Sequence, residues 1–195
     1  MRKFNAVLIV VVGGLLLAAA ARAQVTNACC LIGPKTKLGA FETNTGTVII
    51  KAYEQIGTVT AGGSVMSVRC KEDTDVSTGC KEHGVSVRFT AGAHVEDTIQ
   101  IDYDELESLL NAIDCLSKID WSVISLTGFD AVYSTKDGLR MAAFSSRRSG
   151  AIEFSLGSAR MSSDPVRLTP TEVAQFRALL EQARNKLDSL RKEKT

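Results

Sequence analysis

The side chains of this chain that could bind a metal ion are few and widely spaced. The histidines are His83 and His94, and the cysteines are Cys29, Cys30, Cys70, Cys80 and Cys115. Cys70, Cys80 and His83 come closest to a ligand set, but a structural zinc site needs a fourth ligand and closer spacing. The histidines also form no H-E-x-x-H pair, which one class of zinc hydrolases requires. The sequence therefore predicts no metal site.

Cys70 and Cys80 are better explained by a disulfide. They flank a segment, 72–79, that is rich in the residue types of turns and joins two expected strands at 65–70 and 80–89. A hairpin of this kind would bring the two cysteines nearly opposite each other, within disulfide range. We predict a Cys70–Cys80 bridge, with two packed thiols as the alternative. The pairing of the remaining three cysteines stays open, and their odd total leaves at least one unpaired within the chain.

Acidic residues gather at Asp102, Asp104, Glu105 and Glu107. They stand where a helix begins, because Asp102 and Glu105 have the spacing of a capping box and carboxylates stabilise a helix N-terminus. The chain has no G-x-S-x-G sequence, phosphate-binding loop or dinucleotide fingerprint. The sequence therefore predicts no catalytic or cofactor-binding residues and favours a non-enzymatic binding protein. An envelope enzyme with a dispersed site is one alternative.

The first 23 residues predict export. Arg2 and Lys3 precede an uncharged run from 6 to 21, and Ala23 ends a small-residue pattern typical of signal peptidase sites. We expect cleavage between Ala23 and Gln24, and a secreted or periplasmic location. The uncharged run is 16 residues long, short of the roughly 20 that a membrane span needs. Cleavage takes the formal charge from +1 to −2, because Arg2, Lys3 and Arg22 are lost. A basic field that would attract nucleic acid or a membrane is therefore not expected.

The mature chain resembles itself at an offset of 67 residues. The alternating apolar positions Val85, Val87 and Phe89 align with Ile152, Phe154 and Leu156, and the capping box at 102–105 aligns with a second at 169–172. Apolar stripes with helical spacing follow both boxes. We predict an α+β fold of two tandem antiparallel units, each β-β-β-β-α, with the helices packed on the sheet faces. Each helix is expected to cover the sheet that precedes it. The competing interpretation is one continuous sandwich with two peripheral helices.

The expected organisation divides the chain into five segments. They are a signal peptide at 1–23, a flexible lead at 24–44, the first unit at 45–120, the second unit at 121–191 and a short tail at 192–195.

The order of four strands and a helix, twice, is similar in layout to single-strand nucleic-acid binders of the Whirly, PC4 and PUR types. Those modules use basic grooves with aromatic stacking platforms. Here Tyr53 and Tyr133 are the candidate outward-facing aromatics, so nucleic-acid binding is a second alternative. The segment 101–110, together with Gly128-Phe129 and 133–136, resembles secreted bacterial proteins that have no assigned function. The resemblance implies no site residues. We expect a partner, such as a protein, to bind at sheet faces or edges, and the sequence specifies neither its identity nor the oligomeric state.

Overall fold

The computed structural model describes residues 33–146, 150–161 and 163–192. The predicted cleavage site at Ala23 and Gln24 lies outside the described residues, as do Cys29 and Cys30.

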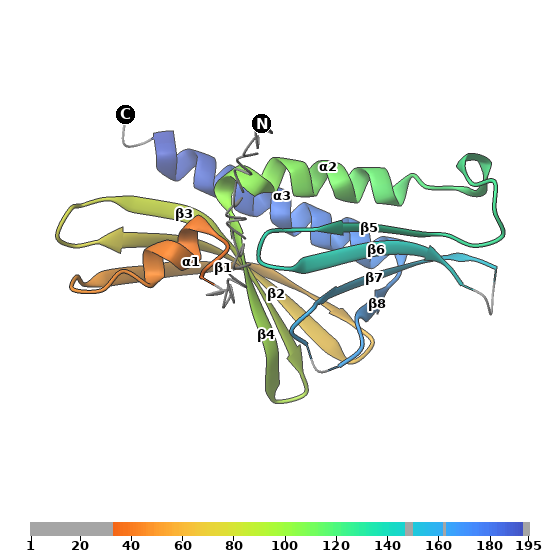
Figure 1. Ribbon diagram of the computed structural model, residues 1–195, viewed down its shortest axis with the longest axis horizontal. Coiled ribbons are helices and arrows are strands. Elements are labelled where there is room, and N and C mark those ends of the chain that lie inside the picture. The colour runs from red at the N-terminus through yellow and green to blue at the C-terminus, as the bar shows by residue number, and fades with distance from the viewer. Residues whose placement is uncertain (1–32, 147–149, 162, 193–195) are drawn as a thin grey trace, which may run out of the picture. The chain divides into compact units, whose positions relative to one another are not determined.

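Two four-stranded antiparallel sheets, each followed by a helix, make up the described chain (Figure 1). The elements of the first unit are α1 (Lys37–Glu42), β1 (Ile49–Ala61), β2 (Ser64–Asp75), β3 (Lys81–Ala91), β4 (His94–Asp102), the 3₁₀ turn η1 (Tyr103–Glu105) and α2 (Leu106–Ser117). The second unit consists of η2 (Trp121–Val123), β5 (Asp130–Ser134), β6 (Leu139–Ser145), β7 (Ile152–Ser158), β8 (Val166–Leu168) and α3 (Pro170–Lys192). The predicted α+β fold of two tandem units is confirmed.

Val87 and Phe154 occupy equivalent positions in the two sheets. Each lies in the third strand of its sheet with its side chain buried. The strand registers differ, because Val87 pairs with Ile99 whereas Phe154 pairs with Leu168 rather than with Val166. Val166 is the residue 67 positions after Ile99, so the β7–β8 register is shifted by two residues relative to the β3–β4 register. Side chains alternate with a period of two, so the slip leaves the same faces buried.

The two capping boxes form as the sequence predicts. The backbone N–H of Asp102 donates to Glu105 Oε2 at 3.4 Å. The backbone N–H of Thr169 donates to Glu172 Oε2 at 2.6 Å, and the Glu172 N–H returns to Thr169 Oγ1 at 3.3 Å. The acidic residues at 102–105 therefore start a helix.

The long helices cover each other's sheets, which corrects the expectation that each covers its own. The α3 helix packs on β1, β2 and β3, whereas α2 packs on β5 and β6. Gly57 in β1 allows the close approach of α3, because a Cβ atom there would lie 2.6 Å from Leu179 Cδ2. The buried side chains of both sheets and both helices form one hydrophobic cluster. The two units therefore share a single core.

The last part of the expected lead contains the α1 helix, which contacts the first sheet. The α1 helix begins after Thr36, whose side chain accepts a hydrogen bond from the Gly39 N–H at 3.0 Å. The backbone N–H groups of Lys37 and Leu38 donate to the carboxylate of Asp102 at 2.9 and 3.2 Å. Leu38 is fully buried, so it anchors α1 to the first sheet.

Candidate functional site

A hollow of about 910 Å³ lies on the face of β5–β8 opposite α2. The residues of β6 alternate across the sheet, with Met141 and Ala143 in the core and Arg140, Ala142 and Phe144 lining the hollow. The hollow falls within the roughly 300–1,000 Å³ range of small-molecule sites. It is therefore the best candidate binding site among the described residues.

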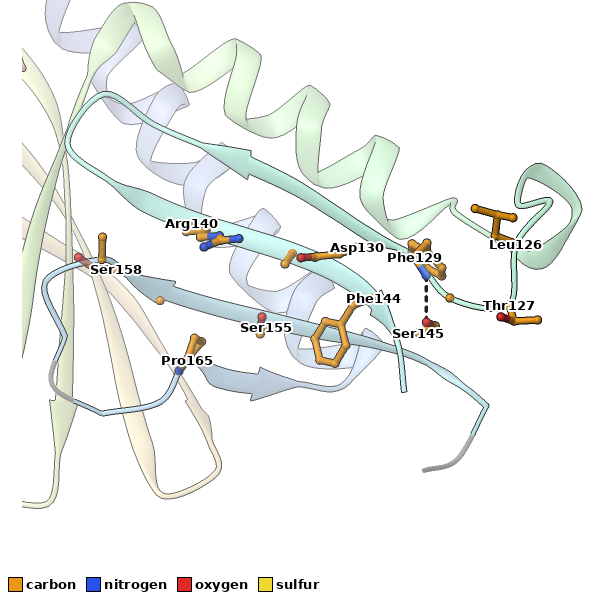
Figure 2. Close-up of a pocket in the computed structure, with 14 residues that line it drawn as sticks. Leu126, Thr127, Phe129, Asp130, Arg140, Phe144, Ser145, Ser155, Ser158 and Pro165 are labelled. Carbon is orange, nitrogen blue, oxygen red and sulfur yellow. Dashed lines mark hydrogen bonds between the residues drawn. The ribbon is translucent and has the colours of Figure 1, made fainter. Parts of the chain in front are cut away.

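Small residues in register make the floor of the hollow. Ala142 pairs with Ser155, and Arg140 pairs with Gly157. A Cβ atom on Gly157 would lie 3.2 Å from Pro165, so the glycine lets the segment before β8 fold close against β7. Figure 2 shows Ser155 and Pro165 among the residues that surround the hollow.

The walls of the hollow combine an aromatic ring with a guanidinium group. Phe144 is half-buried, and the guanidinium of Arg167 lies 5.3 Å from its ring centroid. Arg140 is exposed, and no carboxylate of the described residues pairs with it. Asp130 also lines the hollow, but it makes no ion pair with a described residue. The site can therefore hold an apolar group beside Phe144 and an anionic group at Arg140.

The rim of the hollow is held by hydrogen bonds at the end of β6. The backbone N–H of Phe129 donates to Ser145 Oγ at 3.0 Å (Figure 2). The Ser145 N–H donates to the Phe129 carbonyl at 3.1 Å. The Phe129 ring meets Trp121 edge-on, with the centroids 5.8 Å apart. These contacts position the exposed side chain of Leu126 at the mouth of the hollow.

The hollow is lined by no histidine or cysteine of the described residues. His83 lies in the first sheet, where its Nε2 is 2.9 Å from Glu72 Oε2, and His94 begins β4. In the part of the chain that the structure describes, no group of histidine, cysteine and carboxylate side chains is suited to a metal ion. The side chains that line the hollow can contribute packing, hydrogen bonds and charge.

The predicted Cys70–Cys80 disulfide is not formed, and both cysteines are free. The strands are longer than predicted, so β2 continues to Asp75 and only 76–80 form the connection to β3. Cys70 lies opposite Val85, whereas the carbonyl of Cys80 accepts a hydrogen bond from the Asp75 N–H. Five residues of strand separate these positions, or about 17 Å.

Cys70 faces α3, where its thiol donates to the Ala183 carbonyl at 3.4 Å. Burial raises the pKa of this thiol to about 11, which lowers the fraction of reactive thiolate. Cys80 and Cys115 are exposed. The three described cysteines are thus dispersed over the fold and do not form a common site.

The two candidate tyrosines lie in different environments. Tyr53 is exposed on β1, where the guanidinium of Arg69 lies 5.4 Å from its ring centroid. Tyr133 is not on an open face, because its hydroxyl is 2.9 Å from Ser108 Oγ of α2. The prediction that both point outward is correct for Tyr53 and wrong for Tyr133.

The sequence alone does not identify the residues of the hollow. Ala142, Ser155 and Gly157 are ordinary strand residues in the sequence. They form a floor only because the β6–β7 register brings them side by side. The sequence feature that could indicate the hollow is the run of small outward-facing residues in two adjacent strands. It becomes informative only when the pairing of these strands is known.

No protein-family model matches this chain, and no curated protein sequence matches it. None of the helices in the described residues is long and apolar enough to cross a membrane.

Proposed function

We propose that this protein is an exported, non-enzymatic binding protein that holds its ligand in the hollow on β5–β8. The proposal rests on a floor of small residues beside the guanidinium group of Arg140, which forms no ion pair with a described residue. The ligand that fits this arrangement combines an apolar group with an anionic group. The apolar part would pack beside Phe144, and the anion would accept hydrogen bonds from Arg140.

Fluorescence of 8-anilinonaphthalene-1-sulfonate tests the hollow, because this probe combines an aromatic system with an anion. We expect the folded protein to bind the probe and Ala142→Trp to abolish binding, since the indole would fill the floor. Arg140→Gln should weaken binding by about tenfold, because one charge-assisted hydrogen bond is lost.

Ala178→Trp is the matched control, since Ala178 is exposed on α3 and lies outside the hollow. It should bind the probe like the unchanged protein. Circular dichroism establishes that each variant is folded. Equal binding by the unchanged protein and folded Ala142→Trp would show that the hollow is not the binding site.

Native mass spectrometry of protein purified from the host's envelope or secreted fraction tests the function itself. We expect a small molecule to copurify with the unchanged protein and with Ala178→Trp, but not with Ala142→Trp. Chemical conversion of that molecule by the purified protein would contradict the proposal and indicate an enzyme with a dispersed site.

A further inference from the structure

A pair of arginines on the first sheet has no anionic partner. Arg69 of β2 and Arg88 of β3 both lie on the face opposite α3, since their neighbours Val68 and Val87 point into the core. No carboxylate of the described residues forms an ion pair with either guanidinium. The Nε atom of each is buried and has no hydrogen-bond partner in the described chain.

The strand register places these two arginines near each other on one face of the sheet. Arg69 pairs with Ser86 and Arg88 pairs with Ser67, so the arginines are diagonal neighbours on adjacent strands. Diagonal neighbours on one face lie about 7–8 Å apart, within reach of long side chains. Two buried donors without hydrogen-bond partners are unfavourable, and a bound anion would satisfy both.

Other arginines of the described chain do form ion pairs with carboxylates. Arg160 contacts Asp97 and Asp137, and Arg177 contacts Asp114 with two nitrogens at 2.5 and 3.0 Å. Carboxylates are thus available to arginines elsewhere in the fold. Arg69 and Arg88 form no ion pair with a described carboxylate, on a chain whose formal net charge is close to neutral.

The surface around the pair is polar. The serines opposite the arginines, Ser67 and Ser86, form the floor. Thr58 and Thr98 flank them in the neighbouring strands, and Tyr53 contributes an exposed ring beside Arg69. The α1 helix borders this face at the end near Gly84, where Leu38 makes its closest approach. A face of hydroxyl groups and guanidinium groups suits a polar, negatively charged chain rather than an apolar one.

We infer that this face binds an acidic polysaccharide, with its carboxylates on Arg69 and Arg88. The guanidinium fork matches a carboxylate in two parallel hydrogen bonds. The serine and threonine hydroxyls can donate to and accept from sugar hydroxyls, and the Tyr53 ring supplies an amphipathic surface at the edge. This site is separate from the hollow on β5–β8 and does not depend on it.

Calorimetric titration of the purified protein with polygalacturonate oligomers tests the inference. We expect binding at low salt that weakens as salt is raised, because the contacts are ionic. Arg69→Gln and Arg88→Gln should each weaken binding by about tenfold. The affinity of Arg69→Lys should lie between those of the unchanged protein and Arg69→Gln, since lysine keeps the positive charge but lacks the forked guanidinium group. Neutral dextran should not bind.

Arg184→Gln is the matched control, because it removes a guanidinium from α3, which packs on the opposite face of the first sheet, and it should leave this binding unchanged. Tyr53→Ala, at an exposed site, should weaken binding without affecting folding. Absence of binding, or binding unaffected by both arginine substitutions in folded protein, would overturn the inference. Tighter binding of oligo-deoxythymidine, lost in the same variants, would also overturn it and assign the face to single-stranded nucleic acid.

Discussion

Asp73 is fully buried in β2, and neither of its carboxylate oxygens has a hydrogen-bond partner among the described residues. Burial raises the pKa of Asp73 to about 6, although Lys71 Nζ lies 3.5 Å away. The pKa of the neighbouring Glu42 of α1 is shifted in the opposite direction. Burial opposes its ionisation, but hydrogen bonds from Lys51 and Lys71 lower the pKa of Glu42 to about 2. One ammonium group thus serves two carboxylates, and Asp73 is the less satisfied of them.

The unsatisfied charge of Asp73 predicts a pH-dependent stability. Its folded-state pKa lies above the value of about 3.9 in an unfolded chain. The stabilising contribution of the protonated form is therefore complete below about pH 4 and is lost as pH rises through 6. We expect Asp73→Asn to raise the free energy of unfolding at pH 7 by roughly 1–2 kcal/mol. The gain should shrink toward pH 4.

Urea unfolding of both proteins between pH 4 and pH 8 measures this effect. Asp164→Asn is the control, since Asp164 is exposed and should change stability little at any pH. A loss of stability in Asp73→Asn at pH 7 would mean that the Lys71 ion pair outweighs the cost of burial.

At the scale of elements, α3 is the cover of the first sheet. Ala183 and Leu187 are fully buried, and Leu187 lies beside Cys70 and Ala52 in a small cavity of about 230 Å³. Asp114 of α2 and Arg177 of α3 join the two helices through paired hydrogen bonds. Each helix is thereby held between the sheet it covers and the other helix.

This packing predicts the order in which the cysteines react. A maleimide should label exposed Cys80 and Cys115 quickly and Cys70 slowly, because Cys70 lies under α3. Leu187→Ala should lower the free energy of unfolding by about 2–5 kcal/mol and speed labelling of Cys70. Mass spectrometry of labelled peptides gives the rate at each site.

The rate at Cys115 serves as the internal control, since this residue is exposed on α2 and should react equally in both proteins. If Cys70 in the unchanged protein is labelled as fast as Cys80, the packing of α3 on the first sheet is contradicted. Peptide mapping of the unlabelled protein under non-reducing conditions should detect no peptide that links Cys70 to Cys80.

At the scale of the whole molecule, the two units are tandem in sequence but joined through one core. Contacts at the surface also connect them, because the Gln100 N–H of β4 donates to Asp137 Oδ2 at 2.7 Å. The Lys136 N–H likewise donates to Glu105 Oε1 at 2.9 Å. The hairpin between β5 and β6 thus contacts the edge of β4 and the start of α2.

The shared core predicts that neither unit folds alone. A fragment covering 33–120 contains the first sheet without α3, and one covering 121–192 contains the second sheet without α2. Each leaves an apolar sheet face uncovered, so we expect both fragments to lack the dispersed amide spectrum of a folded protein. Mixing them should restore that spectrum, since every element is then present. A fragment that folds alone would show that the two units have separate cores.

The sequence by itself determined the elements and their inward faces. The period of two placed Val87 and Phe154 in the core, and both capping boxes start helices where predicted. These features are local, because a strand's alternation and a helix cap depend on residues only a few positions apart. The strand ends were less accurate, and the early end assigned to β2 produced the wrong Cys70–Cys80 pairing.

Only the tertiary structure decided which helix covers which sheet, and with it the candidate sites. An apolar helix stripe fits either apolar sheet face, since burial of nonpolar surface has no directional preference. Strand register then decides whether Ala142, Ser155 and Gly157 line one hollow, and whether Arg69 and Arg88 become neighbours. The strand register and the choice of the sheet that each helix covers both depend on contacts between distant parts of the chain. Alternation along one strand therefore carries no information about them.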